Sequence, residues 1–201
     1  MRGLRLARCR SMGVNDYEQV LVTSRAQWRE WLTANADTSP GVWLITYKRG
    51  TGQPAPTYDD VVEECLCFGW IDSTGRPRDE ETGMQLVTPR KPRSTWAATN
   101  KVRIERLLEA GLMTERGLRV IAAAKANGSW TSLDAVERME VPDDLAAGLE
   151  ERPPARANFD AFPPSARKQV LWYVISAKRP ETRAARIARV VAAAAEGRRT
   201  P

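Results

Sequence analysis

The sequence predicts an α+β fold, in which a small, mainly antiparallel sheet packs with helices in an N-terminal body and an all-helical C-terminal segment follows. Two observations predict it. Runs dense in β-branched and aromatic residues, which favour strands, occur before about Ser94 and disappear after it. Beyond that point, apolar residues recur at helical spacing between glycine and proline residues. Strands followed by helices are typical of α+β proteins rather than of doubly wound parallel sheets.

The first elements are a strand, a helix and a second strand. A short extended piece covers Glu18 to Val22. The capping box Ser24-Arg-Ala-Gln27 then begins a helix, because a hydroxyl and a glutamine three residues later satisfy free N–H groups. The turn cluster Asp37-Thr-Ser-Pro-Gly41 ends that helix. Val42 to Lys48, rich in β-branched and aromatic residues, is the predicted central strand.

A second helix and a strand pair follow. Thr57-Tyr-Asp-Asp60 opens the helix, and Gly69 ends it. Trp70 to Ser73 and Met84 to Thr88 predict two antiparallel strands joined by the polar connection Thr74 to Gly83.

Helices make up the remainder of the prediction. Their ranges are Trp96 to Ala110, Thr114 to Ala126, Pro142 to Glu150, Pro164 to Ala177 and Glu181 to Glu196. Glycine and proline residues separate them, as expected at helix ends.

The charge of the chain is unevenly distributed. Residues 1–12 carry four arginines and no acid, and residues 13–150 carry 16 basic and 21 acidic residues. Residues 151–201 carry 11 basic and four acidic residues, which suggests an anionic partner for this segment, or a helix face that is simply solvated.

We therefore predict three regions. Residues 1–16 form a disordered basic arm, residues 17–150 form the α+β body, and residues 151–201 form the helical segment, whose helices follow Pro153-Pro154. Translation starts at Met1 or at Met12, and the sequence does not decide between them.

Composition excludes several classes of protein. The 201 residues include no histidine, which excludes His-activated nucleophiles, His-ligated zinc and a His general base. No stretch approaches the roughly 18 consecutive apolar residues of a membrane span, so we expect a soluble protein. The three cysteines, Cys9, Cys65 and Cys67, are odd in number and unsuited to a secreted disulfide framework, which favours the cytoplasm.

The first candidate site is a basic loop that lies between a strand and a helix. Basic side chains beside the free N–H groups of a helix start favour anion binding. A Ser or Thr hydroxyl can cap the helix, and a tryptophan can supply a wall or a stacking plane. The residues expected to contribute are Arg90, Lys91, Arg93, Ser94, Trp96 and Asn100.

The second candidate site is a cationic stripe on the last helix. Arginines at every third position cover a broad helix face, which can hold phosphate or carboxylate, or can pair with the acidic body. The residues expected to contribute are Lys178, Arg179, Glu181, Arg183 and Arg186. We expect the two basic stretches to converge on one anionic ligand.

Acidic residues provide two further candidates. Asp72 follows a Gly-Trp-Ile run and needs a cationic partner such as Lys48, Arg90 or Arg93, in a structural salt bridge or in a functional site. Carboxylates at the start of the second helix have the spacing to share a divalent cation, but acidic residues also stabilise a helix N-terminus. They are Asp59, Asp60, Glu63 and Glu64. We favour the second interpretation, and expect no metal and no cofactor.

Five ordered motifs resemble those of one bacterial family. They are Gly41-Val-Trp-Leu-Ile-Thr-Tyr-Lys48, Tyr58 to Ser73, Thr88 to Trp96 with Asn100, Ala110-Gly-Leu-Met113, and Ser176-Ala-Lys-Arg-Pro-Glu-Thr-Arg183. On these motifs the chain resembles the YdeI/OmpD-associated proteins, often labelled bacteriocin-protection proteins, from about residue 17 to residue 191. The resemblance implies an association with stress or antimicrobial-peptide resistance, and it transfers no catalytic residue. Ala97 stands where the family usually has serine, which argues against a hydroxyl nucleophile after Trp96.

These observations support three hypotheses. The first is a cytoplasmic protein, associated with stress or antimicrobial resistance, that binds an anionic small molecule or an acidic protein surface in a cationic cleft without catalysis. The second is a histidine-free enzyme that uses Asp72 with Arg and Lys residues for proton transfer. The third is a nucleic-acid-binding protein, suggested by a basic pI of about 9.5 and by Trp96 beside basic residues.

Overall fold

The computed structural model describes residues 16–199, so the expected basic arm lies outside the described residues except for Asp16. The chain divides into two compact units. The N-terminal unit contains the chain up to Ser94 together with Asn100–Asn127, and the C-terminal unit contains Thr95–Thr99 together with the chain from Gly128 onwards. The division therefore falls at Gly128, whereas Pro153-Pro154 lies inside the helical unit.

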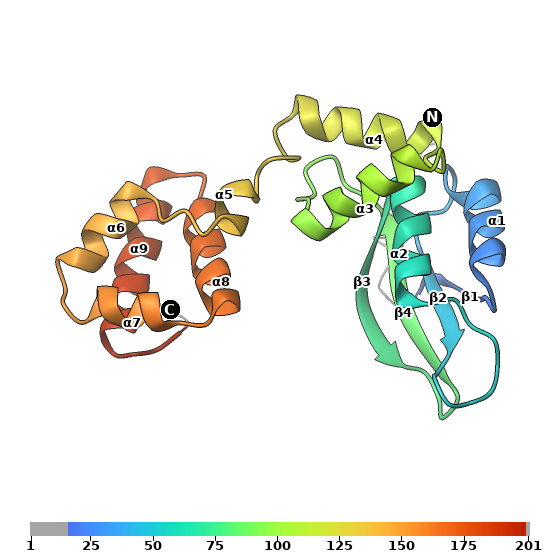
Figure 1. Cartoon of the computed structure of the whole chain (residues 1–201), viewed down its shortest axis with the longest axis horizontal. Helices are drawn as coiled ribbons and strands as arrows, with labels where there is room; N and C mark the ends of the chain where they lie inside the picture. Colours follow the sequence, from blue (N-terminus) through green and yellow to red (C-terminus); the bar gives the residue numbers. More distant parts are fainter. Residues whose placement is uncertain (1–15, 200–201) are drawn as a thin grey trace, which may run out of the picture. The chain divides into compact units, whose positions relative to one another are not determined.

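A four-stranded sheet forms the centre of the N-terminal unit (Figure 1). Its strands are β1 (Glu18–Leu21), β2 (Val42–Tyr47), β3 (Trp70–Pro77) and β4 (Thr82–Pro89), in the order β1-β2-β4-β3. β1 pairs with β2 in parallel, and the pairs β2–β4 and β4–β3 are antiparallel. The α+β prediction and the mainly antiparallel sheet are confirmed.

The β3–β4 hairpin is longer than the sequence suggested. The strands run to Pro77 and from Thr82, so the turn between them is short. The Asp79 carboxylate closes this turn, because it accepts hydrogen bonds from the Thr82 backbone N–H at 2.6 Å and from the Thr82 hydroxyl at 2.7 Å. Polar residues that resemble a loop in sequence are here strand residues held by an Asx-type turn.

Two helices, α1 (Arg25–Asn35) and α2 (Tyr58–Cys67), pack against each other, and α2 also contacts β3. Both helix starts are confirmed. The Ser24 hydroxyl accepts the N–H of Gln27, and Thr57 forms a capping box with Asp60. Trp28 stacks on Trp31 of α1, and the rings of Trp31 and of Trp70 on β3 meet in a T-shaped contact.

The helices α3 (Ala98–Glu109) and α4 (Glu115–Ala126) follow the sheet in the chain. α3 begins two residues later than predicted, and the Ser94 N–H closes a turn with the Lys91 carbonyl instead. α4 contacts α2 closely at Gly117, where an added Cβ would lie 2.2 Å from the carbonyl oxygen of Cys67.

Between residues 128 and 199, the C-terminal unit contains five helices: α5 (Asp134–Glu137), α6 (Asp143–Glu150), α7 (Ala155–Ala161), α8 (Pro164–Ile175) and α9 (Pro180–Ala195). α9 is the central helix, since it contacts α6, α7 and α8 (Figure 1). Its Val190, Val191 and Ala194 are buried with Leu145 of α6 and Phe159 of α7 in one apolar core. Among residues 16–199, no helix is long and apolar enough to cross a membrane.

Candidate functional site

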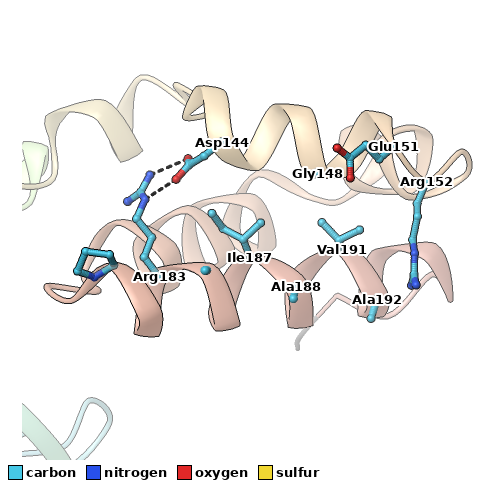
Figure 2. Close-up of a pocket in the computed structure, with 11 residues that line it drawn as sticks. Asp144, Gly148, Glu151, Arg152, Arg183, Ile187, Ala188, Val191 and Ala192 are labelled. Carbon is cyan, nitrogen blue, oxygen red and sulfur yellow. Dashed lines mark hydrogen bonds and ion pairs between the residues drawn. The ribbon is translucent and has the colours of Figure 1, made fainter.

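A groove runs between α6 and α9 in the C-terminal unit (Figure 2). Its volume is about 640 Å³. Its floor is apolar, since Ile187 and Val191 point from α9 towards α6 and three alanines of α9, Ala184, Ala188 and Ala192, lie along it. Gly148 faces this floor from α6, and a Cβ there would lie 3.2 Å from Val191 and 3.3 Å from Ile187. A glycine therefore allows the two helices to approach each other under the groove.

An ion pair closes one end of the groove. Nε and Nη2 of Arg183 donate to the two carboxylate oxygens of Asp144 at 2.6 and 2.8 Å. This bidentate bond lowers the pKa of Asp144 and raises that of Arg183. Among residues 16–199, the third nitrogen of Arg183, Nη1, donates to no group, so one edge of the guanidinium group keeps a free N–H donor.

Further charged residues lie at or near the two ends of the groove. Arg152 and Glu151 lie at the end opposite Asp144, and both are exposed. Lys178 and Arg179 precede Pro180, which lines the groove at the first turn of α9, and both are exposed. Within the described chain, Arg152, Lys178 and Arg179 take part in no ion pair. The N-terminus of α9 has no side-chain cap, so its first N–H groups add positive potential near these cations.

The predicted stripe on α9 therefore divides into two kinds of residue. Arg183 pairs with Asp144, and Arg186 donates through Nη1 to the Tyr173 carbonyl at 2.6 Å and to the Ser176 hydroxyl at 2.9 Å. These contacts stabilise the end of α8 and its junction with α9. Lys178, Arg179 and Glu181 are exposed and remain open to a partner.

The predicted basic loop is placed differently. Lys91 and Arg93 are exposed, whereas Arg90 is only 7% exposed. Trp96 is 1% exposed and packs on Trp130, with ring centroids 5.1 Å apart, so it offers no open stacking plane. Asn100 accepts a hydrogen bond from Nη1 of Arg103 at 3.2 Å.

Asp72 lies in a polar cluster on β3. Its Oδ2 accepts hydrogen bonds from the Tyr58 hydroxyl at 3.0 Å and from Nε2 of Gln85 at 2.8 Å. Of the three cations considered as partners, Arg90 lies near enough for the Asp72 charge to act on it: burial lowers the pKa of Arg90 to about 10, and the Asp72 carboxylate opposes this effect. Lys48 instead donates to the backbone carbonyls of Asp79 at 2.6 Å and Glu80 at 3.1 Å.

The two basic stretches belong to different units. Arg90, Lys91 and Arg93 are part of the N-terminal unit, and the segment from Lys178 to Arg186 is part of the C-terminal unit. Their convergence on one ligand stays a prediction.

Several functional candidates were missed by sequence reasoning. Tyr58 and Gln85 reach Asp72 through strand register and the position of α2, and Asp144 reaches Arg183 across a helix pair, so no local motif signals either contact. Glu64 is 1% exposed and accepts from Arg25 and Arg29 at 2.7 Å each, although the sequence suggested only a favourable helix start.

Comparison with known families divides the chain in a similar way. Residues 20–120, half of the chain, match the family model described as Domain of unknown function (DUF8412). The chain belongs to the DUF8412 family. Residues 138–197 match a second model, described as Bacteriocin-protection, YdeI or OmpD-Associated. No curated protein and no solved structure is significantly similar to the chain.

The family resemblance expected over about residues 17–191 is therefore supported in its C-terminal part. The motifs up to Met113 lie in the DUF8412 region instead, and only Ser176 to Arg183 falls in the second match. All residues that line the α6/α9 groove lie between Asp144 and Ala192, inside this second match.

Proposed function

We propose that this DUF8412 protein binds an anionic small molecule with an apolar body in the α6/α9 groove, without catalysis. One observation carries the proposal: an apolar groove of about 640 Å³ ends beside exposed cations that form no ion pair within residues 16–199. That volume lies in the range of small-molecule sites, about 300–1,000 Å³.

The floor of the groove favours an apolar group. Ile187 and Val191 present branched side chains, and the alanines beside them leave space that a hydrocarbon chain can fill. Burial of such a chain contributes roughly 25 cal/mol per Å² of apolar surface removed from water.

The ends of the groove favour a negative charge. Lys178 and Arg179 lie next to the uncapped start of α9, and Nη1 of Arg183 supplies a further donor there. Arg152 provides a cation at the other end. The acidic side chains Asp144, Glu151 and Glu181 oppose an anion, but Asp144 is already neutralised by Arg183. The cationic groups therefore outnumber the acidic groups that remain unpaired.

Calorimetric titration with octanoate tests this proposal, with acetate and octyl glucoside as probes that lack the chain or the charge. We expect saturable binding of one octanoate, with a Kd on the order of 0.1–1 mM at about −0.5 kcal/mol per heavy atom. Acetate lacks the apolar chain and octyl glucoside lacks the negative charge, so each should bind at least about tenfold more weakly than octanoate. Equal binding of octyl glucoside and octanoate would refute an anion site.

Two matched variants locate the site. Ala188→Glu places a carboxylate on the groove floor, and Ala185→Glu makes the same change on an exposed residue of α9 that does not line the groove. The first should weaken octanoate binding at least about tenfold, and the second by no more than about twofold, because unit charges separated by solvent are screened. Equal losses in both variants would show a non-specific charge effect instead.

The other two hypotheses have less support. Trp96 is buried, so the nucleic-acid hypothesis loses the aromatic residue on which it depended. For an enzyme, burial raises the pKa of Cys67 to about 11, which keeps this thiol protonated. We propose that Asp72 positions Tyr58 and Gln85 rather than transferring a proton.

We also propose that this binding takes place in the bacterial cytoplasm and serves resistance to bacteriocins or related stress. Two observations support this proposal. The family model that covers the groove is described as Bacteriocin-protection, YdeI or OmpD-Associated, and the cysteines Cys65 and Cys67 are free and buried. A deletion strain complemented by Ala188→Glu should remain as sensitive to bacteriocin as the uncomplemented strain, whereas Ala185→Glu should restore resistance.

A further inference from the structure

A second cavity lies in the N-terminal unit, on the sheet face beyond the start of α2. Its volume is about 370 Å³. Its lining includes Thr46, Tyr58, Gly75, Arg76, Gly83 and Gln85. It is separate from the α6/α9 groove, and the function proposed above does not use it.

Strand register explains the flat floor of this cavity. Leu44 pairs with Gln85, which pairs with Gly75, so these three lie in one row across the sheet. Thr46 pairs with Gly83 in the next row on the same face. A Cβ at Gly75 or Gly83 would meet no atom closer than 3.9 Å. The two glycines thus leave open backbone surface beside Thr46, on which a planar group can lie.

Tyr58 forms a wall of the cavity. The residue is 58% exposed, an unusual value for a large aromatic residue, and yet its hydroxyl is held by Asp72 at 3.0 Å. Burial and the Asp72 carboxylate raise the pKa of Tyr58, so the phenol stays protonated and keeps donating. An exposed ring that is already held in place loses little conformational freedom when a ligand stacks on it.

Gln85 supplies the polar group of the cavity. Its Nε2 donates to the same Asp72 oxygen at 2.8 Å, which fixes the orientation of the amide and leaves Oε1 as an acceptor. The Thr46 hydroxyl can donate or accept on the same face. Asp72 does not itself line the cavity, so it acts as a positioning residue for Tyr58 and Gln85.

Among residues 16–199, no charged side chain is directed into this cavity. Arg76 contributes to the lining, but it pairs with Met84 in the register, so its side chain lies on the opposite face. There its guanidinium group lies over the Trp43 ring, 4.5 Å from the centroid, and Nε contacts the Met84 sulfur at 3.4 Å. A ligand therefore meets neutral donors and acceptors, an aromatic ring and a glycine floor.

We infer that this cavity binds an uncharged, planar aromatic or heteroaromatic molecule that carries a hydrogen-bonding group such as an amide. The ring stacks on Tyr58 over Gly75 and Gly83, and the polar group bonds with Gln85 and Thr46. The class is that of aromatic amides and nucleobase-like heterocycles, which share a flat ring and an edge with donors and acceptors.

NMR titration of the full chain with benzamide tests the inference. Benzamide should shift the backbone amide signals of Gly75 and Gly83 in a saturable way. Cyclohexanecarboxamide has the same amide on a non-planar ring, and benzoate and benzamidine carry charges, so all three should bind at least about fivefold more weakly. Equal binding of cyclohexanecarboxamide would overturn the requirement for a planar ring, and equal binding of benzoate or benzamidine would overturn the requirement for an uncharged ligand.

Variants separate the role of each contact. Gly83→Val fills the floor without a backbone clash, and Tyr58→Ala removes the wall, so each should weaken benzamide binding at least about tenfold. Asp72→Asn should weaken it about threefold by loosening both partners, whereas Asp59→Asn, which makes the same charge change outside the lining, should leave it unchanged. A dispersed spectrum confirms that each variant is folded. Unchanged binding in folded Gly83→Val and Tyr58→Ala would overturn the inference.

Discussion

Gly117→Ala tests how closely α4 packs on α2. A Cβ at Gly117 would lie 2.2 Å from the Cys67 carbonyl oxygen and 3.0 Å from the end of Met113. The Met113 side chain can move, but the Cys67 oxygen belongs to the backbone of α2 and also accepts the Thr114 hydroxyl at 2.6 Å. The variant can fold only if α4 moves away from α2, which lengthens this hydrogen bond.

The expected magnitude combines opposing effects. Overpacking costs about 1–3 kcal/mol, and the weakened hydrogen bond costs about 1 kcal/mol. Alanine favours the helix over glycine by about 1 kcal/mol. We therefore expect Gly117→Ala to lower the free energy of unfolding of the N-terminal unit by about 1–3 kcal/mol.

Native-state hydrogen exchange of the amides of α2 and α4 measures this change within the N-terminal unit, because global unfolding of a chain with two units need not be two-state. The exposed Ala122→Gly in the same helix calibrates the propensity effect, and it should cost about 1 kcal/mol. If the α2 and α4 amides of Gly117→Ala instead exchange more slowly, by the roughly 1 kcal/mol that helix propensity alone gives, the close contact at Gly117 is refuted.

Two further predictions concern buried and exposed charges. Glu64→Gln should lower the free energy of unfolding of the N-terminal unit by about 2–4 kcal/mol, measured by native-state hydrogen exchange, because it leaves Arg25 and Arg29 without a buried carboxylate. The exposed Glu30→Gln should change it by less than about 0.5 kcal/mol, and equal effects would contradict the role of Glu64. Arg183 holds the pKa of Asp144 below its ordinary value of 3.8, so the pair stabilises the fold above that pH and loses this effect as the pH falls through the lowered pKa. Asp144→Asn should therefore lower the free energy of unfolding of the C-terminal unit by up to about 1 kcal/mol at pH 7, and should not change it in strong acid. Unfolding measured at each pH tests this, and a loss of stability that does not depend on pH would contradict the pairing.

Local signals in the sequence predicted most of the fold. The cap signals at Ser24 and Thr57 identified two helix starts, and the β-branched run from Val42 identified a strand, because those signals depend on residues close together in the chain. α5 and α7, with four and seven residues, were missed because helical periodicity needs several turns to become visible.

The candidate sites were less predictable, because they depend on contacts between distant residues. The groove exists because Gly148 lets α6 approach α9, and its ion pair joins Asp144 to Arg183, 39 positions later. Similarly, Asp72 stood out as a carboxylate next to an apolar run, but its partners Tyr58 and Gln85 follow from register and helix placement. The residue type could be recognised in the sequence, whereas its role required the tertiary structure.

The most direct measurement of the central claim is the position of bound octanoate in the complex. Intermolecular NOEs from the octanoate methylenes should reach the methyl groups of Ile187, Val191 and Ala188, with the carboxylate nearest the start of α9. NOEs confined to exposed apolar side chains of the N-terminal unit, such as Leu112 and Leu118, would contradict an anion-binding groove between α6 and α9.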